Sequence, residues 1–480
     1  MTYDKLFKEL KSVVGNDYVV HHEAGLIVFE YDGSVDKALP LAVVLPATPE
    51  DVSQVVKIAR RHNVPIIPRG AGTGLSGGVI PTQGGLMVAL TRMTRVLEID
   101  PENRIAVVEP GVVNIDLSVA ASKYGLYFAP DPSSQKACTI GGNVAENSGG
   151  PHCLAYGVTT NHVLGMEVVL PDGAISWVGG RTPERPGLDL RGILIGSEGT
   201  LAITTKIVVR LLKQPEMVKT LVAAYKNLDE GSAAVSDIIA SGIVPAALEM
   251  MDDLAIAAAE PAVHAGYPPD AGAILLVEIE GLKESVEEES SLIEEVCRRH
   301  NAVEIRTAED AAQRERLWAG RKGALGALGR LAPNYYLIDG TIPRTKLVEV
   351  MARIKEISKE TGYPIANVLH AGDGNLHPCV LFDERKPGDV ENITKIGGDI
   401  LKLCVDVGGV LSGEHGIGVE KQEYMPFMFT DDDMAAMARL KLAFETGDVF
   451  NPGKIFPTGA SCVDISQMGA IAKTGAGAFI

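Results

Sequence analysis

PRGAGTGLSGG, the stretch from Pro68 to Gly78, is the part of the sequence that decides the fold. A run of glycines lets the backbone approach a ligand closely, and its consecutive N–H groups can bind a pyrophosphate. Gly72-x-Gly74-x-x-Gly77 formally matches the dinucleotide fingerprint, but that motif needs a helix directly after it. VIPTQGG follows instead, and its proline and glycines disfavour a helix. We therefore favour a phosphate-binding loop of another kind over a NAD-type Rossmann motif or a purely structural turn.

A strand–helix–strand unit leads into this loop. LAVVLP (41–46) and VPIIP (64–68) have the composition of short buried strands. Between them, Thr48 is a predicted helix N-cap, Pro49 takes the first helical position and Asp51 completes a capping box. The apolar residues that follow at helical spacing predict a helix as far as Asn63.

Two further glycine-rich stretches follow the first. PDPSSQKACTIGGNVAENSGG (130–150) predicts close-approach loops at 139–143 and 147–150. GSEGTLAITTKIVVRL (196–211) places Glu198 and Gly199 directly before a predicted strand. Three such loops suit a long polar ligand rather than a single phosphate.

Composition excludes several classes of function. The 480 residues are 46% hydrophobic, which is enough for two or three domains. The formal net charge of −18 argues against nucleic acid or an anionic membrane as a partner. An anionic substrate would therefore need local positive charge from Arg, Lys or a metal. The six cysteines include no CxxC pair, which argues against an iron–sulfur cluster or a Cys-rich zinc site and fits a reducing compartment.

The predicted secondary structure changes along the chain. The N-terminal MTYDKLFKELKSVVG predicts an amphipathic helix rather than a signal peptide, and no segment reaches the ~18 apolar residues of a membrane span. We therefore expect no transmembrane segment and a cytoplasmic protein. Residues 68–210 are mostly strand-like, whereas from about 217 to 410 longer helices alternate with strands such as AILLVEIEG. Residues 458–480 suit either a mobile tail or a segment that docks a partner.

Three of the ten histidines lie in two motifs, His370-AGDGNL-His377 and SG-Glu414-His415-GIG. Two imidazoles and a carboxylate form an ordinary ligand set for a divalent ion with open positions. Because adjacent residues usually point in different directions, one of Glu414 and His415 can bind a metal while the other faces a substrate. A purely structural role accounts less well for two motifs that both pair histidine with acid and glycine.

The order PRGAGTGLSGG, PDPSS…TIGGN, GSEGTLAI resembles the flavin domain of the vanillyl-alcohol-oxidase family. The resemblance implies that the first loop holds the FAD pyrophosphate, the second lies along the flavin and the ribityl chain, and the third flanks the adenine end. It also implies non-covalent FAD, because the first loop lacks the histidine that some members link to the flavin. The residues implied to bind FAD are Pro68, Arg69, Gly70, Ala71, Gly72, Thr73, Gly74, Ser76, Gly77, Pro130, Asp131, Pro132, Ser133, Thr139, Gly141, Gly142, Asn143, Ala145, Asn147, Gly149, Gly150, Gly157, Glu198, Gly199, Ile203 and Asn451.

The histidine motifs resemble those of FAD-linked 2-hydroxy-acid dehydrogenases, a group that includes glycolate oxidase catalytic subunits, D-lactate dehydrogenases and D-2-hydroxyglutarate dehydrogenases. The likeness extends to 317–344 and 450–457 and spans roughly residues 40–457. It implies a divalent metal (Zn, Fe or Mn) on His370, His377 and Glu414, with His415 as general base. Arg321 matches the arginine that binds the substrate carboxylate, although a surface charge on a helix is the simpler alternative.

Two positions differ from the D-2-hydroxyglutarate dehydrogenases, whose substrate is a diacid, and they limit the size and charge of the substrate that the resemblance implies. Leu337 stands where they carry a lysine, and Cys379 stands where they carry an asparagine. Loss of both polar groups favours a small monocarboxylate, D-lactate or glycolate. Reduced FAD would then pass its electrons to a partner protein, an electron-transferring flavoprotein or an iron–sulfur subunit.

The predicted fold is α+β, a two-domain flavoprotein of the vanillyl-alcohol-oxidase type. We expect an FAD-binding domain over 1–215, a substrate (cap) domain with an antiparallel sheet over 216–410, a segment closing the flavin site over 411–457, and a tail over 458–480. Two alternatives stay open at this point. A flavin subunit that only relays electrons would have no use for the metal motifs, and a metal hydrolase on an unrelated fold would leave the three glycine loops without a role.

Overall fold

The computed structural model describes residues 3–184, 187–444, 447 and 449–457, so the predicted tail, 458–480, lies outside the described residues. These residues form two compact units. The first unit comprises the described residues within Met1–Ser148, Val158–Lys213 and Glu414–Ile480, and the second comprises Gly149–Gly157 and Gln214–Gly413. No feature of the sequence predicted that residues 149–157 belong to the second unit.

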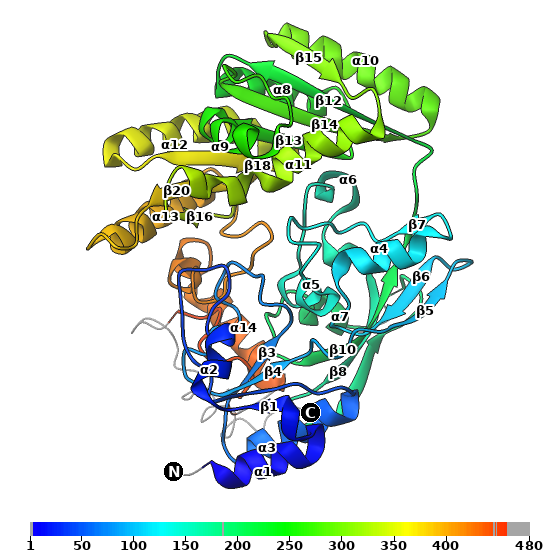
Figure 1. The fold of residues 1–480 in the computed structure, drawn as a ribbon, viewed down its shortest axis with the longest axis vertical. Coiled ribbons are helices and arrows are strands. Elements are labelled where there is room, and N and C mark those ends of the chain that lie inside the picture. The colour runs from blue at the N-terminus through cyan, green and yellow to red at the C-terminus, as the bar shows by residue number, and fades with distance from the viewer. Residues whose placement is uncertain (1–2, 185–186, 445–446, 448, 458–480) are drawn as a thin grey trace. The chain divides into compact units, whose positions relative to one another are not determined.

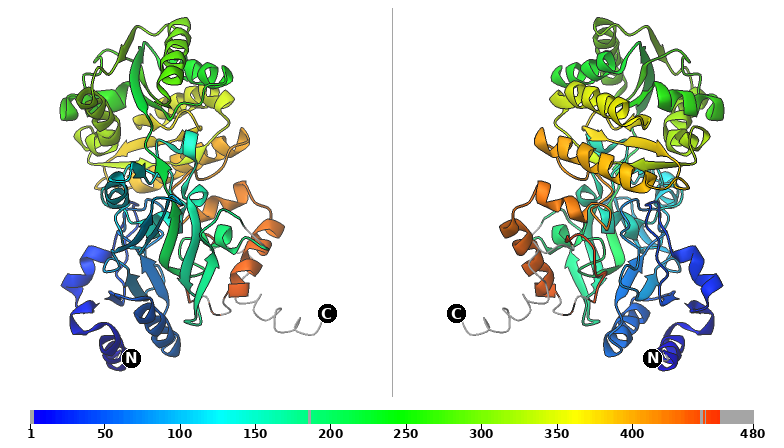
Figure 2. Two further views of the ribbon diagram at one scale, coloured as in Figure 1. Left: turned by 90° about the vertical axis from the view of Figure 1, so that its right-hand side faces the viewer. Right: turned by 90° about the vertical axis from the view of Figure 1, so that its left-hand side faces the viewer.

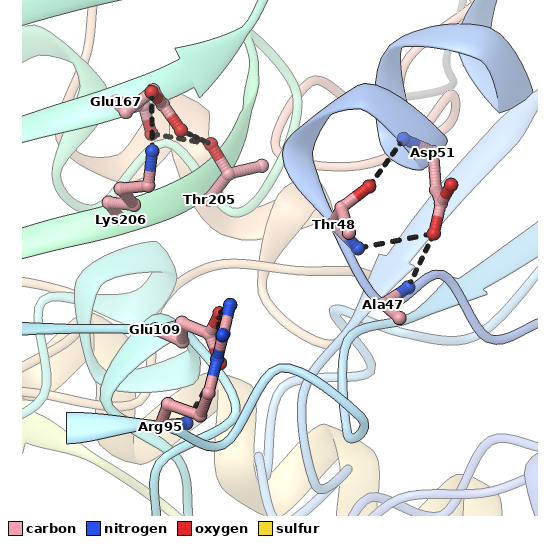
Figure 3. Close-up of polar contacts among 8 residues, drawn as sticks. All are labelled: Ala47, Thr48, Asp51, Arg95, Glu109, Glu167, Thr205 and Lys206. Carbon is pink, nitrogen blue, oxygen red and sulfur yellow. Dashed lines mark hydrogen bonds and ion pairs between the residues drawn. The ribbon is translucent and has the colours of Figure 1, made fainter. Parts of the chain in front are cut away.

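The first unit begins with a small, mainly parallel sheet. Its strand order is β1 (Val19–Val20), β2 (Ala42–Val44), β4 (Leu86–Ala89), β3 (Ile66–Arg69), and only the β1–β2 pair is antiparallel. Helices α1 (Asp4–Val14) and α3 (Pro49–Arg61) bury apolar faces in the same core. The Thr48–Asp51 capping box is formed as predicted: the Asp51 N–H donates to Thr48 Oγ1, and the Asp51 carboxylate accepts the Thr48 N–H (Figure 3).

A five-stranded antiparallel sheet forms the rest of this unit. Its order is β5 (Val96–Asp100), β6 (Ile105–Val108), β10 (Ile203–Arg210), β8 (Val163–Val169), β9 (Ile175–Gly179). Side-chain pairs link neighbouring segments: Glu167 on β8 binds Thr205 and Lys206 on β10, and Arg95 binds Glu109 (Figure 3). Helices α4 (Asn114–Ser122) and α5 (Ile140–Glu146) contribute apolar side chains to the core of this sheet.

The second unit is built on a seven-stranded sheet in which every neighbouring pair is antiparallel (Figure 1). Its order is β15 (Glu304–Thr307), β12 (Met217–Tyr225), β14 (Ala273–Gly281), β13 (Ala247–Asp252), β18 (Ile365–Leu369), β20 (Pro378–Phe382), β16 (Asn334–Leu337). The predicted antiparallel sheet of the second domain is therefore confirmed.

Helices cover both faces of this sheet. Apolar residues of α9 (Asp253–Val263) and α11 (Ala311–Ala327) share a core with Ala247 and Met251 of β13. The neighbouring Met250 points the other way, towards Gly231 of α8 (Leu228–Ala240), and α8 contacts α10 (Lys283–Arg299) and α12 (Leu347–Thr361). This alternation places Glu249 on the α9/α11 face.

After Gly413 the chain returns to the first unit. A 3₁₀ helix (Gln422–Phe427) and α14 (Asp431–Phe444) follow, and residues 449–451 run beside β3, where Ile66 and Phe450 form a bridge (Figure 2, orange to red). Within the described part of the chain, every helix is too short or too polar to cross a membrane.

The prediction of a loop at 139–143 was wrong, because Ile140–Glu146 forms helix α5. Thr139 caps this helix by accepting the Gly142 N–H, which offsets the poor helix propensity of two glycines. Gly141 is required by close packing, since a Cβ there would lie 2.5 Å from the Pro110 side chain. By contrast, the predicted strands at 41–46 and 64–68, with a helix between them, are confirmed by β2, β3 and α3.

Candidate functional site

The first glycine loop exposes a run of backbone donors in the first unit. None of the N–H groups from Ala71 to Gly77 donates a hydrogen bond to another described residue. Gly70 packs against the second glycine-rich stretch so tightly that a Cβ would lie 2.5 Å from Thr139 Oγ1. The Ser76 hydroxyl is buried and likewise has no partner among the described residues. A cradle of unused donors fits a phosphate-containing ligand.

Asn451 joins the first loop, the third loop and the C-terminal segment. Its side-chain amide is buried and donates to the carbonyl oxygens of Gly78 (2.8 Å) and Glu198 (2.7 Å). The Val419 N–H donates to the Ser76 carbonyl at 2.9 Å, which fixes the C-terminal segment to the first loop a second time. The structure therefore brings together three of the predicted FAD-binding residues, Asn451, Glu198 and Ser76.

The second stretch is held by a buried asparagine that the sequence did not single out. Asn114 Nδ2 donates to the Pro130 carbonyl and to Asn143 Oδ1, so it connects the proline turn to α5. Ile203 lies in the apolar core of the first unit, which leaves its backbone rather than its side chain for a ligand. Gly149, Gly150 and Gly157 belong to the second unit. The FAD contacts of all the residues predicted in and after this stretch stay a prediction.

Buried charges surround the meeting point of these loops. Glu198 accepts the N–H groups of Ile417 and Gly418, both at 2.7 Å, and burial nevertheless raises its pKa above the ordinary value. Burial, reinforced by the charge of Glu198, raises the pKa of Glu146. Lys454 has its pKa lowered to about 8 by burial, an effect that Glu198 partly offsets. These loops therefore combine two buried carboxyl groups whose pKa values are raised with a buried lysine whose pKa is lowered.

A second cluster lies in the second unit and centres on Arg321. This residue is 2% exposed on α11, so the simpler interpretation as a surface charge is wrong. Its Nη2 lies 2.5 Å from Glu249 Oε2 and 3.5 Å from His370 Nδ1. Its Nε is buried without a partner among the residues that the structure describes. A buried N–H of this kind is costly unless a hydrogen-bond acceptor binds it, and a guanidinium donor suits a carboxylate.

His370 and His377 are brought together by a tight turn. His370 follows the last residue of β18, the chain reverses at Gly372–Gly374, and β19 (Asn375–Leu376) leads into His377. Gly374 has φ +82° and faces the Ile342 carbonyl so closely that a side chain could not fit. The two imidazole rings lie 5.0 Å apart, nearly perpendicular. The predicted pair of imidazole ligands is therefore assembled within one unit.

Asp339 lies beside this pair and anchors the end of the second unit. It is fully buried, and Oδ2 accepts the Ser412 hydroxyl (2.6 Å) and the Gly413 N–H (3.1 Å). Asp339 and His377 offer ligand atoms within 4.8 Å of each other. Glu414 and His415 come next in the sequence and belong to the first unit, where His415 Nε2 lies 4.0 Å from Glu414 Oε1.

Leu337 and Cys379, the two positions predicted to disfavour a diacid substrate, are neighbours in the sheet. Leu337 on β16 and Cys379 on β20 are directly paired across the sheet, and both are buried. Burial, reinforced by Asp252, raises the pKa of the Cys379 thiol, so this side chain stays neutral and acts as a small apolar group. Together they form an apolar patch at this end of the sheet.

Glu249 is the residue of this cluster that the sequence analysis missed. It binds both Arg321 and His370, and it is 1% exposed. The signal was present in VPAALEMMDD, where one glutamate interrupts an apolar strand. A buried acid in such a strand indicates a partner or a function.

Comparison with known proteins identifies the family. Residues 40–179 match the family described as FAD binding domain, and residues 214–455 match FAD linked oxidases, C-terminal domain. The chain is 45% identical over 451 residues to glycolate oxidase subunit GlcD of Escherichia coli K12, covering 94% of this chain and 90% of that protein. The chain belongs to the FAD-linked oxidases. It is therefore an FAD-linked oxidoreductase, as the sequence predicted.

This FAD-linked oxidase also has relatives that are named for a second activity. It is 35% identical over 415 residues to a D-lactate dehydrogenase of Archaeoglobus fulgidus, covering 86% of this chain and 90% of that one. Its fold matches the structure of p-cresol methylhydroxylase with a TM-score of 0.80 at 18% identity, covering 94% of this chain and 96% of that one. The predicted vanillyl-alcohol-oxidase type of fold is thus confirmed.

Proposed function

We propose that this FAD-linked oxidase oxidises a small 2-hydroxy acid, glycolate or D-lactate, to the 2-oxo acid. The observation that carries the proposal is the buried Arg321, with an unused Nε, beside the His370–His377 pair. The names of the relatives support the choice of substrates. An electron-relay subunit would need neither a buried anion-binding arginine nor a pair of imidazoles.

Arg321 would bind the substrate carboxylate. A guanidinium offers five N–H donors in a planar fork, and Nη2 is the nitrogen that lies 2.5 Å from Glu249. The free Nε can therefore donate to a carboxylate while Glu249 holds the rest of the side chain. Burial strengthens this interaction because water cannot compete for the charge.

His370, His377 and Glu414 would hold a divalent ion, Zn, Fe or Mn. A donor set of two imidazoles and one carboxylate, with positions left open, suits each of these ions. Bound there, the ion would lower the pKa of the substrate α-hydroxyl. Since Glu249 neutralises Arg321 and Glu414 neutralises half of the ion's charge, one positive charge would remain for the single carboxylate of the substrate.

His415 would act as general base. An imidazole has a pKa near neutrality, so it can accept the α-hydroxyl proton at working pH. FAD, when bound, supplies the acceptor for the hydride that leaves Cα as the C–O double bond forms. The balance is one proton to His415 and one hydride to the flavin, and both must later leave the enzyme.

The buried pair Leu337 and Cys379 supports a monocarboxylate over a diacid. A second carboxylate placed against this apolar patch would lose its hydration without gaining a partner. The choice between glycolate and D-lactate depends on a methyl group, which is worth only about 1–3 kcal/mol in an apolar pocket. Both substrates are therefore expected to react.

The proposal includes non-covalent FAD and a protein electron acceptor. The unused donors from Ala71 to Gly77 support phosphate binding, and the loop offers no histidine for a covalent link. The acceptor would be an electron-transferring flavoprotein or an iron–sulfur subunit, because the chain has no spacing of cysteines for a cluster of its own.

An anaerobic titration tests this function. The purified, metal-loaded protein is mixed with glycolate, D-lactate, L-lactate or D-2-hydroxyglutarate while the absorbance of oxidised flavin is followed. We expect glycolate and D-lactate to bleach the flavin and D-2-hydroxyglutarate to do so poorly. His415→Asn should retain FAD yet lose most of the reduction rate, by about 100-fold or more. Rapid bleaching of His415→Asn would exclude His415 as the base, and faster bleaching by the diacid would overturn the substrate class.

A further inference from the structure

We infer that Glu249 is the positioning residue of this site: one buried carboxylate that sets the tautomer of His370 for metal binding and holds Arg321 for the substrate. This inference rests on the proposed function, because it assigns Glu249 a role towards a metal and a carboxylate substrate. It adds a residue to the site that neither the glycine loops nor the histidine motifs contain.

The place of Glu249 in the sheet is unfavourable unless it has such a role. It lies in the middle of β13, and every residue of that strand is buried. Its neighbours on the same face, Ala247 and Met251, pack into the apolar core beneath α9 and α11. A carboxylate at this position loses its hydration, which is unfavourable unless charged partners replace the water. An aliphatic residue would suit packing alone better.

Strand register aims the carboxylate at His370. Met250 is paired with Leu369, and Met251 with Val368, in the antiparallel β13–β18 ladder. Continued by one residue, this register puts Glu249 opposite His370, so their side chains lie on the same face. The contacts agree, since His370 Nδ1 lies 2.9 Å from Oε1 and 2.8 Å from Oε2 of Glu249.

These distances determine which nitrogen of His370 carries the proton. Nδ1 lies 2.8 Å from a carboxylate, which only accepts hydrogen bonds, and 3.5 Å from the Arg321 Nη2, which only donates. The shorter contact dominates, so Nδ1 is protonated and donates to Glu249. Nε2 then keeps its lone pair, the form that ligates a metal. A carboxylate on the second nitrogen also makes a histidine a stronger ligand.

Arg321 depends on the same carboxylate. Its Nη2 lies 2.5 Å from Glu249 Oε2, and this is the ion pair that compensates a charge only 2% exposed. Without Glu249, the guanidinium would be buried without the carboxylate that now pairs with it. Substitution of Glu249 should therefore weaken both metal binding and substrate binding. Substitution of a residue with only a packing role would not be expected to weaken these two functions together.

The chain offers a matched control in Glu278. This carboxylate on β14 is also fully buried and also binds one arginine and one histidine, Arg314 at 2.6 Å and His152 at 3.2 Å. Neither partner is a proposed ligand. The other partners of Glu278 are Thr220 and Trp318, so its contacts among the described residues do not include Arg321 or His370. Glu278→Gln therefore reproduces the loss of a buried charge in the same sheet at a carboxylate that contacts neither of those two residues.

The experiment measures Zn²⁺ affinity of FAD-loaded protein after the metal has been removed with a chelator. Wild type, Glu249→Gln, Glu249→Asp and Glu278→Gln are titrated with Zn²⁺ against a competing indicator. We expect Glu249→Gln to bind Zn²⁺ about 10–100-fold more weakly than wild type. Glu249→Asp, which keeps the charge on a shorter side chain, should fall between them, and Glu278→Gln should match wild type. With Zn²⁺ saturating, the KM for glycolate should also rise in Glu249→Gln.

Each other outcome overturns a defined part of the argument. Equal Zn²⁺ affinity of wild type and Glu249→Gln overturns the inference and leaves the proposed function standing. An equal loss in Glu278→Gln assigns the effect to the sheet and also overturns it. Absence of Zn²⁺ binding by wild type overturns the metal in the proposed function and this inference with it. If the Glu249 variants fail to fold, ¹⁵N-histidine NMR of Zn²⁺-loaded wild type decides, because the inference requires a proton on Nδ1 of His370.

Discussion

Asn451 offers the sharpest test of how the three glycine-rich parts of the first unit are held together. Asn451→Ala removes the amide that donates to the carbonyl oxygens of Gly78 and Glu198. The side chain is 1% exposed, so water cannot easily take its place. Both carbonyls belong to loops that we expect to contact FAD. If the substitution makes these loops less ordered, the affinity for FAD should fall.

The expected cost has two parts. Each buried carbonyl left without its donor costs about 1–3 kcal/mol. Asn451 also has φ +42°, in the left-handed region, where alanine is disfavoured by about 1–2 kcal/mol. Asn451→Ala should therefore lower the free energy of unfolding of this unit by about 3–8 kcal/mol. If a third of that loss falls on the FAD complex, the Kd for FAD rises by about 5- to 90-fold, because about 1.4 kcal/mol corresponds to a factor of ten.

Urea unfolding and FAD titration of the deflavinated protein measure the two quantities. Asn451→Gly removes the amide without the strain, and it should retain most of the effect. Asn63→Ala carries the strain alone, since Asn63 has φ +50° and is exposed at the end of α3. If Asn451→Ala is no less stable than Asn63→Ala, or if it binds FAD as wild type does, the two hydrogen bonds are not what holds the loops.

Two further predictions concern the second unit. Hydrogen bonds from His152 and Arg314 outweigh burial and hold the pKa of Glu278 below its ordinary value of 4.5, so its contribution to stability is present above that pH and is lost in acid. Urea unfolding followed by tryptophan emission, to which the buried Trp318 contributes beside the exposed Trp177, should show a shallower acid decline in stability in Glu278→Gln than in wild type. Parallel curves would contradict this. Arg321→Lys should raise the KM for glycolate by about 10–100-fold, since an ammonium cannot reproduce the fork, while the flavin spectrum stays unchanged; an unaltered KM would remove Arg321 from substrate binding.

Local features of the sequence were enough to predict much of the first unit. The helix from Pro49 could be placed because its capping box and apolar spacing lie within a few neighbouring residues. The glycine loop was correctly separated from a Rossmann motif by the residues that follow it. The mistaken loop at 139–143 also came from reading local features, because two glycines were given more weight than the Thr139 cap. The close packing of Gly141 against Pro110, which explains one of those glycines, joins separate parts of the chain.

The histidine motif was predictable in kind, and its geometry follows from the turn. Eight residues separate a strand end from its return, and their two glycines suit a tight reversal. The sequence could therefore suggest that His370 and His377 act together. The sequence did not predict that Asp339 lies beside these histidines. The hydrogen bonds of Asp339 to Ser412 and Gly413 join segments more than seventy residues apart.

Glu249 shows most clearly where sequence reasoning ends. A glutamate among Ala247, Leu248, Met250 and Met251 indicates that a buried acid needs a partner, and this much is local. The identity of the partner depends on β18 lying next to β13, and Glu249 and His370 are 121 residues apart in the chain. A shift of one residue in that register would turn the carboxylate to the opposite face, towards α8. The role of Glu249 is thus a property of strand order and register, which the pattern of one strand does not contain.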